Sequence, residues 1–271
     1  YSYDITPPTD DRPFIGHYFK WSQIDQIIAG WGKTWQPFGG AGYLVIVGLL
    51  LLTIIAGSGL TLLPWIVRLI KQRKYPDSIK QPQPSLCDFI YFACIGLGYL
   101  LVEIPLIQKF ILYLEQPAYA FTSILFAILF FSGCGSLFAH KISLKICLIG
   151  ITGLVLISPF VIPIVFERSL GLMLGWRMVI TIILVAPLGL LMGMPFPAGL
   201  RWILEKGYAA YIPWFWGVNG AASVVSAILA AIIALSFGFS WVLRIGAAAY
   251  LLGLFMVSRV NRSAKELLCH Q

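Results

Sequence analysis

One long apolar stretch, residues 88–113, constrains the fold more than any other part of the sequence. It reads DFIYFACIGLGYLLVEIPLIQKFILY, and a transmembrane helix needs only about 20 mostly apolar residues. Glu103 lies near its middle, and Gln108 follows about one turn later, on what we expect to be nearly the same face. A carboxylate in hydrocarbon costs at least about 2.5 kcal/mol. We therefore expect other helices to surround this one and to shelter Glu103 from lipid.

The composition indicates a membrane protein. Hydrophobic residues make up 59% of the chain and charged residues 11%, whereas an ordinary soluble domain is about 25% charged. A net charge of +8 could suggest nucleic acid as a partner. The basic residues, however, form short clusters between apolar runs, which is typical of cytoplasmic loops. We therefore expect a lipid bilayer as partner and no nucleic acid.

Seven apolar runs predict an all-α, polytopic transmembrane bundle of about seven helices, because no run in the body of the chain alternates like a strand. Around them, residues 1–20 are interpreted as the tail of an upstream soluble domain, and residues 21–42 as an interfacial segment. Residues 195–213 are predicted to form a loop with room for a short helix, and residues 259–271 a basic tail. The predicted spans are residues 43–70, 88–113, 119–138, 146–166, 172–194, 214–237 and 240–258.

The distribution of Lys and Arg predicts the orientation. With seven spans, twelve of the nineteen basic residues fall on the side that holds the C-terminal tail. The positive-inside rule makes that side cytoplasmic. The tail is then cytoplasmic, and the N-terminal segment lies outside.

Small residues recur at intervals of four within several spans. Gly171 and Gly175 form one such pair, Gly189 and Gly193 form another, and a smooth stripe covers residues 217–227. Small residues at this spacing let helix backbones approach closely. We expect these positions to lie at helix–helix contacts.

Four polar residues inside the predicted spans make up a candidate intramembrane site: Glu103, Gln108, Arg177 and Asn219. In one interpretation Glu103 binds a cation or carries a proton, and a polyamine is a natural cationic guest. In the other, Glu103 bonds to Asn219 or Arg177 and holds the bundle in register. Gln108 and Asn219 are expected to bridge helices. Arg177 either pairs or extends to the lipid headgroups.

The sequence predicts no catalytic, cofactor or metal site in these residues. The five cysteines form no CxxC pair, and the three histidines are scattered, so the spacing does not suit a metal. No nucleophile or acid–base pair stands out.

Several motifs, taken in order, resemble the membrane-bound spermidine synthase-like proteins. The resemblance covers nearly the whole chain, from about Pro8 to about Met256. The motifs are TDDRPF at 9–14, WQPFGG at 35–40, GLGYLLVEIPLIQ at 96–108, GMPFPAGLR at 193–201 and WGVNGAAS at 216–223.

The resemblance implies a fusion of an aminopropyltransferase-like domain, ending near Phe14, with helices similar to the major facilitator superfamily. The glycine loop and catalytic acids would lie upstream, and the second to seventh spans would match one six-helix half. A substrate of the S-adenosyl-methionine type belongs in the cytoplasm, whereas the charge count places Tyr1 outside. Either the upstream domain does not use that substrate, or the span count is off by one.

Two functions follow as hypotheses. The first is a membrane anchor in a prokaryotic inner membrane that serves the upstream domain of the same protein, with a small cation as a candidate substrate. The second is a transporter whose six-helix half pairs with another half, upstream or in a second copy of the chain. The transporter hypothesis requires Glu103 for uptake of the substrate, whereas the anchor hypothesis does not.

Overall fold

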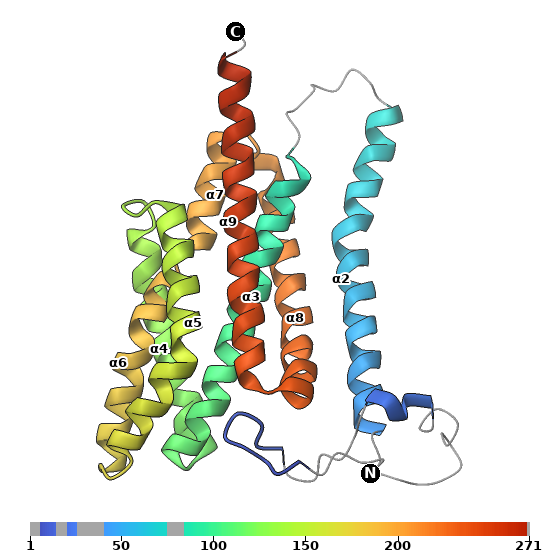
Figure 1. Cartoon of the computed structure of the whole chain (residues 1–271). Coiled ribbons are helices and arrows are strands. Elements are labelled where there is room, and N and C mark those ends of the chain that lie inside the picture. Colours follow the sequence, from blue (N-terminus) through green and yellow to red (C-terminus); the bar gives the residue numbers. More distant parts are fainter. Residues whose placement is uncertain (1–5, 15–20, 26–40, 75–83, 270–271) are drawn as a thin grey trace.

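The computed structural model describes residues 6–14, 21–25, 41–74 and 84–269. The described chain is helical, apart from one isolated bridge between Thr9 and Arg12 (Figure 1). Its elements are η1 (Trp21–Gln23), α2 (Ala41–Lys74), α3 (Leu86–Leu114), α4 (Pro117–Phe138), α5 (Leu144–Ser169), α6 (Leu174–Met192), α7 (Pro195–Glu205), η2 (Ala209–Tyr211), α8 (Ile212–Phe237) and α9 (Phe239–Cys269).

The predicted all-α polytopic bundle is confirmed. Six stretches of the described residues are long and apolar enough to cross a membrane, and α2 adds a shorter apolar segment, Leu44–Gly59. Helices suit this environment because they satisfy every backbone polar group internally, as a bilayer requires. The six stretches are Leu86–Leu114, Pro117–Phe138, Leu144–Ser169, Leu174–Glu205, Ala209–Phe237 and Phe239–Arg259.

The segment 195–213 contains the short helix for which the prediction left room. This helix, α7, begins at Pro195, because proline suits the first turn of a helix, where its missing N–H is not needed. One boundary differs from the sequence prediction. The predicted tail 259–271 is not separate from the last span, since α9 continues as one helix to Cys269. The chain therefore forms seven long helices and one short one within the described residues.

Helix α3 lies at the centre of the bundle, flanked by α8 and α9 (Figure 1). It is the most buried of the candidate spans. Glycines permit this packing: Gly96 lies against the backbone of Asn219 on α8, and Gly98 lies against the ring of Tyr250 on α9. A larger side chain at either position would separate α3 from its neighbours.

Of the two predicted glycine pairs, one packs as expected. Gly189 lies against Ile128, and Gly193 lies against the carbonyl of Ser132, so α6 and α4 are in close contact. The prediction for Gly171 and Gly175 was wrong, because a side chain at either position would meet no atom of the described chain. Spacing alone does not reveal which face of a helix meets a neighbour.

The two ends of the bundle carry different parts of the chain (Figure 1). Residues 6–14 lie at the end that holds the turn between α8 and α9, here called the α8–α9 end. Helix α7 and the C-terminal end of α9 lie at the opposite end, here called the α7 end. The two segments thus lie at opposite ends of the bundle, and which end is cytoplasmic stays a prediction.

Candidate functional site

The contact between α3 and α8 is polar as well as close. Side chains on one face of α8 donate to backbone carbonyls of α3, all within the predicted small-residue stripe or beside it. Such bonds hold two helices at a fixed rotation, because each donor must reach one particular carbonyl. Asn219 Nδ2 donates to the carbonyl of Phe92 at 3.0 Å, Ser223 Oγ to that of Gly96 at 3.1 Å, and Ser226 Oγ to that of Leu97 at 2.6 Å.

Asn219 therefore bridges helices, as the sequence predicted, but its partner is the α3 backbone and not Glu103. The amide N–H thus aligns α8 with α3. Its role is structural, and it does not join the candidate site around Glu103.

Glu103 is buried, with 6% of its surface exposed. The hydroxyls of Tyr99 on α3 and Tyr250 on α9 both interact electrostatically with its carboxyl group. The carboxyl group forms no hydrogen bond or ion pair with any residue that the structure describes. The expected shelter from lipid is present, and the expected partner is not.

Arg177 belongs to α6. It lies at the α8–α9 end of the bundle, beside the C-terminal end of α3 and far from Glu103. Its Nη1 donates to the carbonyl of Tyr113 and to Oε1 of Glu115, each at 2.8 Å. The side chain is buried, and its guanidinium lies over the Tyr113 ring. The prediction that Arg177 holds Glu103 was wrong: it fastens α6 to the C-terminal end of α3.

Gln108 does not bridge helices. It is exposed and lines a surface hollow of about 550 Å³ between α3 and α4. The expectation that Gln108 shares a face with Glu103 was also wrong. Five residues along an α-helix correspond to a rotation of about 140°, so Gln108 points away from the core that Glu103 enters.

A buried ion pair that the sequence analysis missed lies at the α7 end. Lys206 Nζ is 2.7 Å from Oδ1 of Asp88, which is 1% exposed. The other carboxylate oxygen, Oδ2, accepts from the backbone N–H and the hydroxyl of Ser85, at 2.8 and 2.9 Å. Lys206 also lies over the Trp202 ring, 3.5 Å from its centroid. The signal was a Ser-x-x-Asp capping motif directly before an apolar run.

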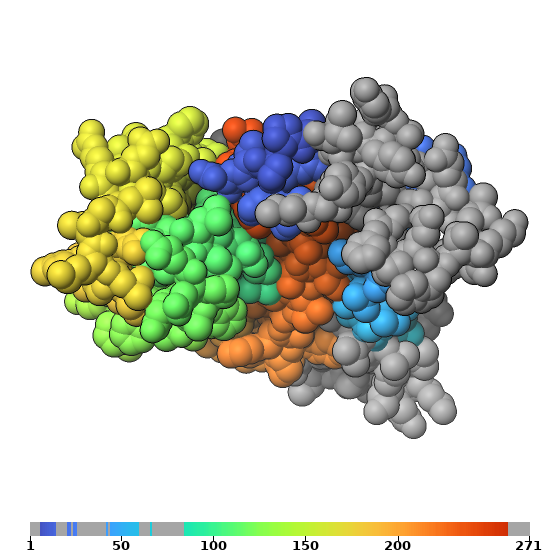
Figure 2. Space-filling model, turned by 90° about the horizontal axis from the view of Figure 1, so that it is seen from below, coloured from blue at the N-terminus to red at the C-terminus, as the bar shows by residue number. Residues whose placement is uncertain are grey.

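A second missed site lies at the α8–α9 end, where residues 9–14, here called the docking turn, contact three helices. Asp11 is 2.7 Å from Lys109 Nζ of α3, and it accepts hydrogen bonds from the Ser240 backbone and hydroxyl in the first turn of α9. Arg12 Nε donates to the Leu235 carbonyl of α8 at 2.9 Å. Phe14 packs against Phe239. Figure 2 shows this segment lying across the end of the bundle.

Asp11 acts as the cap of α9. Burial acts to raise its pKa, but the hydrogen bonds from Lys109 and Ser240 and the charge of Lys109 outweigh burial, so the pKa is lowered. An anion is stabilised at a helix N-terminus because the unpaired N–H groups there carry partial positive charge. The docking turn is thus held most firmly when Asp11 is ionised.

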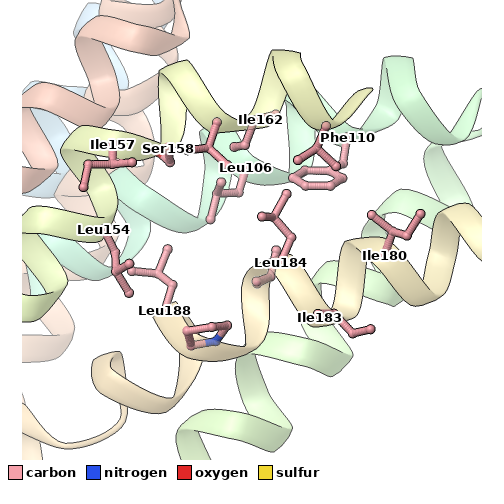
Figure 3. Close-up of a pocket in the computed structure, with 14 residues that line it drawn as sticks. Leu106, Phe110, Leu154, Ile157, Ser158, Ile162, Ile180, Ile183, Leu184 and Leu188 are labelled. Carbon is pink, nitrogen blue, oxygen red and sulfur yellow. The ribbon is translucent and has the colours of Figure 1, made fainter. Parts of the chain in front are cut away.

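The cavity between α3, α5 and α6 does not suit a polyamine. Its volume is about 410 Å³, and it is lined by aliphatic side chains and Phe110 (Figure 3). Ser158 is its one polar side chain, and its hydroxyl already donates to the Val155 carbonyl. A polycation needs carboxylates or aromatic faces directed at it. This space suits hydrocarbon.

The chain matches no protein-family model, no curated protein and no solved structure. Within the described ranges, no three His, Cys, Asp or Glu side chains lie together as metal ligands would. Fold and site together define a class: an all-α polytopic membrane protein that has, within its described residues, one buried carboxyl group without an ion-pair partner and a turn fastened to one end of the bundle.

Proposed function

We propose that this helical bundle is the membrane anchor of a spermidine synthase-like protein, and that the docking turn fixes the soluble domain preceding it. The observation that carries the proposal is the fastening of residues 9–14. Asp11 and Arg12 engage α3, α8 and α9 through an ion pair, a helix cap and a backbone contact. The motif resemblance supplies the identity of the domain.

The number and kind of these contacts support an anchor rather than a loose tether. A flexible linker keeps its ends independent and has no need for specific partners. Here one short turn uses a carboxylate, a guanidinium and a phenyl ring to contact α3, α8 and α9. A domain attached directly before such a turn is held at a defined position over the bundle.

The proposal is tested on the full-length protein in membranes. Wild type and Lys109→Met are compared by hydrogen–deuterium exchange of residues 9–14, and both membranes are assayed for aminopropyl transfer to a diamine. We expect activity in the membrane fraction and faster exchange in the variant. Lys145→Met, an exposed lysine at the α7 end, serves as the matched control. Unchanged exchange in Lys109→Met, or membranes without transferase activity, contradicts the anchor.

The transporter half remains a second proposal, favoured by one observation. Glu103 is buried in the membrane-spanning part without a basic partner among the described residues, and such carboxyl groups often lie on ion or proton pathways. Under this proposal Glu103→Gln abolishes substrate-dependent uptake into vesicles and leaves expression intact. Uptake that is absent in the parent protein, or unchanged in the variant, favours the anchor.

A further inference from the structure

Two carboxyl groups are buried in the described chain, and only one has a cation. Asp88 has Lys206 at 2.7 Å. The other cations near the core are also engaged: Lys109 with Asp11, and Arg177 with Glu115. Among the described residues, none forms an ion pair with Glu103. A bare carboxylate removed from water without a partner is so costly that the group instead becomes neutral.

The ionisable groups that interact electrostatically with Glu103 are neutral hydroxyls. Tyr99 lies one turn before it on α3, and its hydroxyl bonds to Ser132 on α4. Tyr250 reaches from α9, and Cys147 of α5 interacts with the same tyrosine. Helix α8 carries no ionisable side chain, and α4 adds only Tyr119 and Cys134. On α6, the one charged group is Arg177, which is engaged elsewhere. On α9, Arg244 is exposed and lies over the Trp241 ring.

The hydroxyl of Tyr250 is itself unsatisfied. It is fully buried and has no hydrogen-bond partner among the described residues. Its ring is fixed in place, because it lies against the glycine face at Gly98 of α3. A buried hydroxyl without a partner costs free energy. A protonated carboxyl group offers both a donor and an acceptor, so it complements this hydroxyl in either direction.

The geometry points to an intramembrane proton-binding site in which the buried Glu103 carries a proton at neutral pH, and the unpartnered Tyr250 hydroxyl is the hydrogen-bond partner that the protonated carboxyl group would gain. The ligand is the proton itself. The site is independent of the docking turn, which lies at the α8–α9 end of the bundle. The proton-binding proposal can therefore be tested independently of the anchor function. Tyr99 adds a second hydroxyl that interacts electrostatically with Glu103 and that bonds to Ser132 on α4.

The proposal is tested by infrared spectroscopy of the whole protein in lipid vesicles at neutral pH. A protonated carboxyl group gives a carbonyl stretch separate from that of carboxylates. We expect this band in the wild type and its loss in Glu103→Gln, a neutral variant of nearly the same shape. A wild-type spectrum without any band that Glu103→Gln removes shows an ionised Glu103 and overturns the proposal.

A second variant tests the hydrogen-bond partner. Tyr250→Phe keeps the ring against Gly98 and removes only the hydroxyl. We expect the Glu103 band to shift to higher wavenumber, because its hydrogen bond is weakened. Tyr113→Phe is the matched control, since its hydroxyl bonds to Ser169 at the α8–α9 end, and it leaves the band in place. An unshifted band in Tyr250→Phe overturns the assignment of Tyr250.

Discussion

Asp88 and Glu103 lie on one helix, about 22 Å apart along its axis, and both are buried. Around Asp88, at the α7 end, three groups serve one carboxylate: the Lys206 ammonium and the N–H and hydroxyl of Ser85. Around Glu103, in the middle of α3, the ionisable groups that interact with the carboxyl group are the phenols of Tyr99 and Tyr250. Both carboxyl groups are buried, but among the described residues only Asp88 has a cation beside it. The difference lies in position along α3: Asp88 lies near its N-terminal end, where Lys206 at the end of α7 reaches it, whereas Glu103 lies in the middle of the helix.

The largest expected effect comes from removing the cation of Asp88. Lys206→Met leaves a buried carboxylate without its charge partner, which typically costs about 3–5 kcal/mol. We expect that loss in the free energy of unfolding, measured by detergent-induced unfolding in mixed micelles. Asp88→Asn combined with Lys206→Met should recover most of it. A double variant as unstable as the single one contradicts a charge-based explanation.

A smaller effect separates the two carboxyl groups directly. Asp88→Asn weakens charge-assisted hydrogen bonds that are each worth about 1.5–3 kcal/mol. Glu103→Gln replaces a neutral acid by a neutral amide and is expected to cost less than about 1 kcal/mol. Both are measured by the same unfolding assay. The comparison between the two regions breaks down if Glu103→Gln destabilises the bundle as much as Asp88→Asn does.

A third carboxyl group, Asp11, provides a pH dependence at the α8–α9 end. Its pKa is lowered in the folded protein from a usual value of 3.8. Its contribution is therefore complete above that usual value and is lost as the pH falls through the lowered pKa. We expect the docking turn to loosen only in strong acid, seen as faster deuterium exchange of residues 9–14. In Asp11→Asn, exchange should be fast at every pH.

The smallest effect is expected at Glu115, whose side chain is 67% exposed although it pairs with buried Arg177. Exposed ion pairs contribute about 0.2–1 kcal/mol. Glu115→Gln should lower the unfolding free energy by about that amount at low salt and by less at high salt. A cost as large as that of Lys206→Met would show that exposure does not decide the strength of these pairs.

The candidate site could be predicted only in part from the sequence. The burial of Glu103 followed from the cost of a carboxylate in hydrocarbon, and the bridging role of Asn219 from its place in an apolar span. Their partners could not be predicted, because each depends on helix rotation. One residue along a helix is a rotation of about 100°. If the predicted rotation of a helix about its axis is wrong by one residue, a side chain expected to be buried is exposed instead, as Gln108 is.

The sequence by itself determined the class of protein and the approximate bounds of its long helices. Runs of apolar residues of this length must be helical in a bilayer, because only local backbone hydrogen bonds can be satisfied there. The tertiary structure decided which charges meet. Asp88 with Lys206, and Asp11 with Lys109 and Ser240, join residues about a hundred or more positions apart. Such contacts depend on how helices pack together, and no local pattern specifies that.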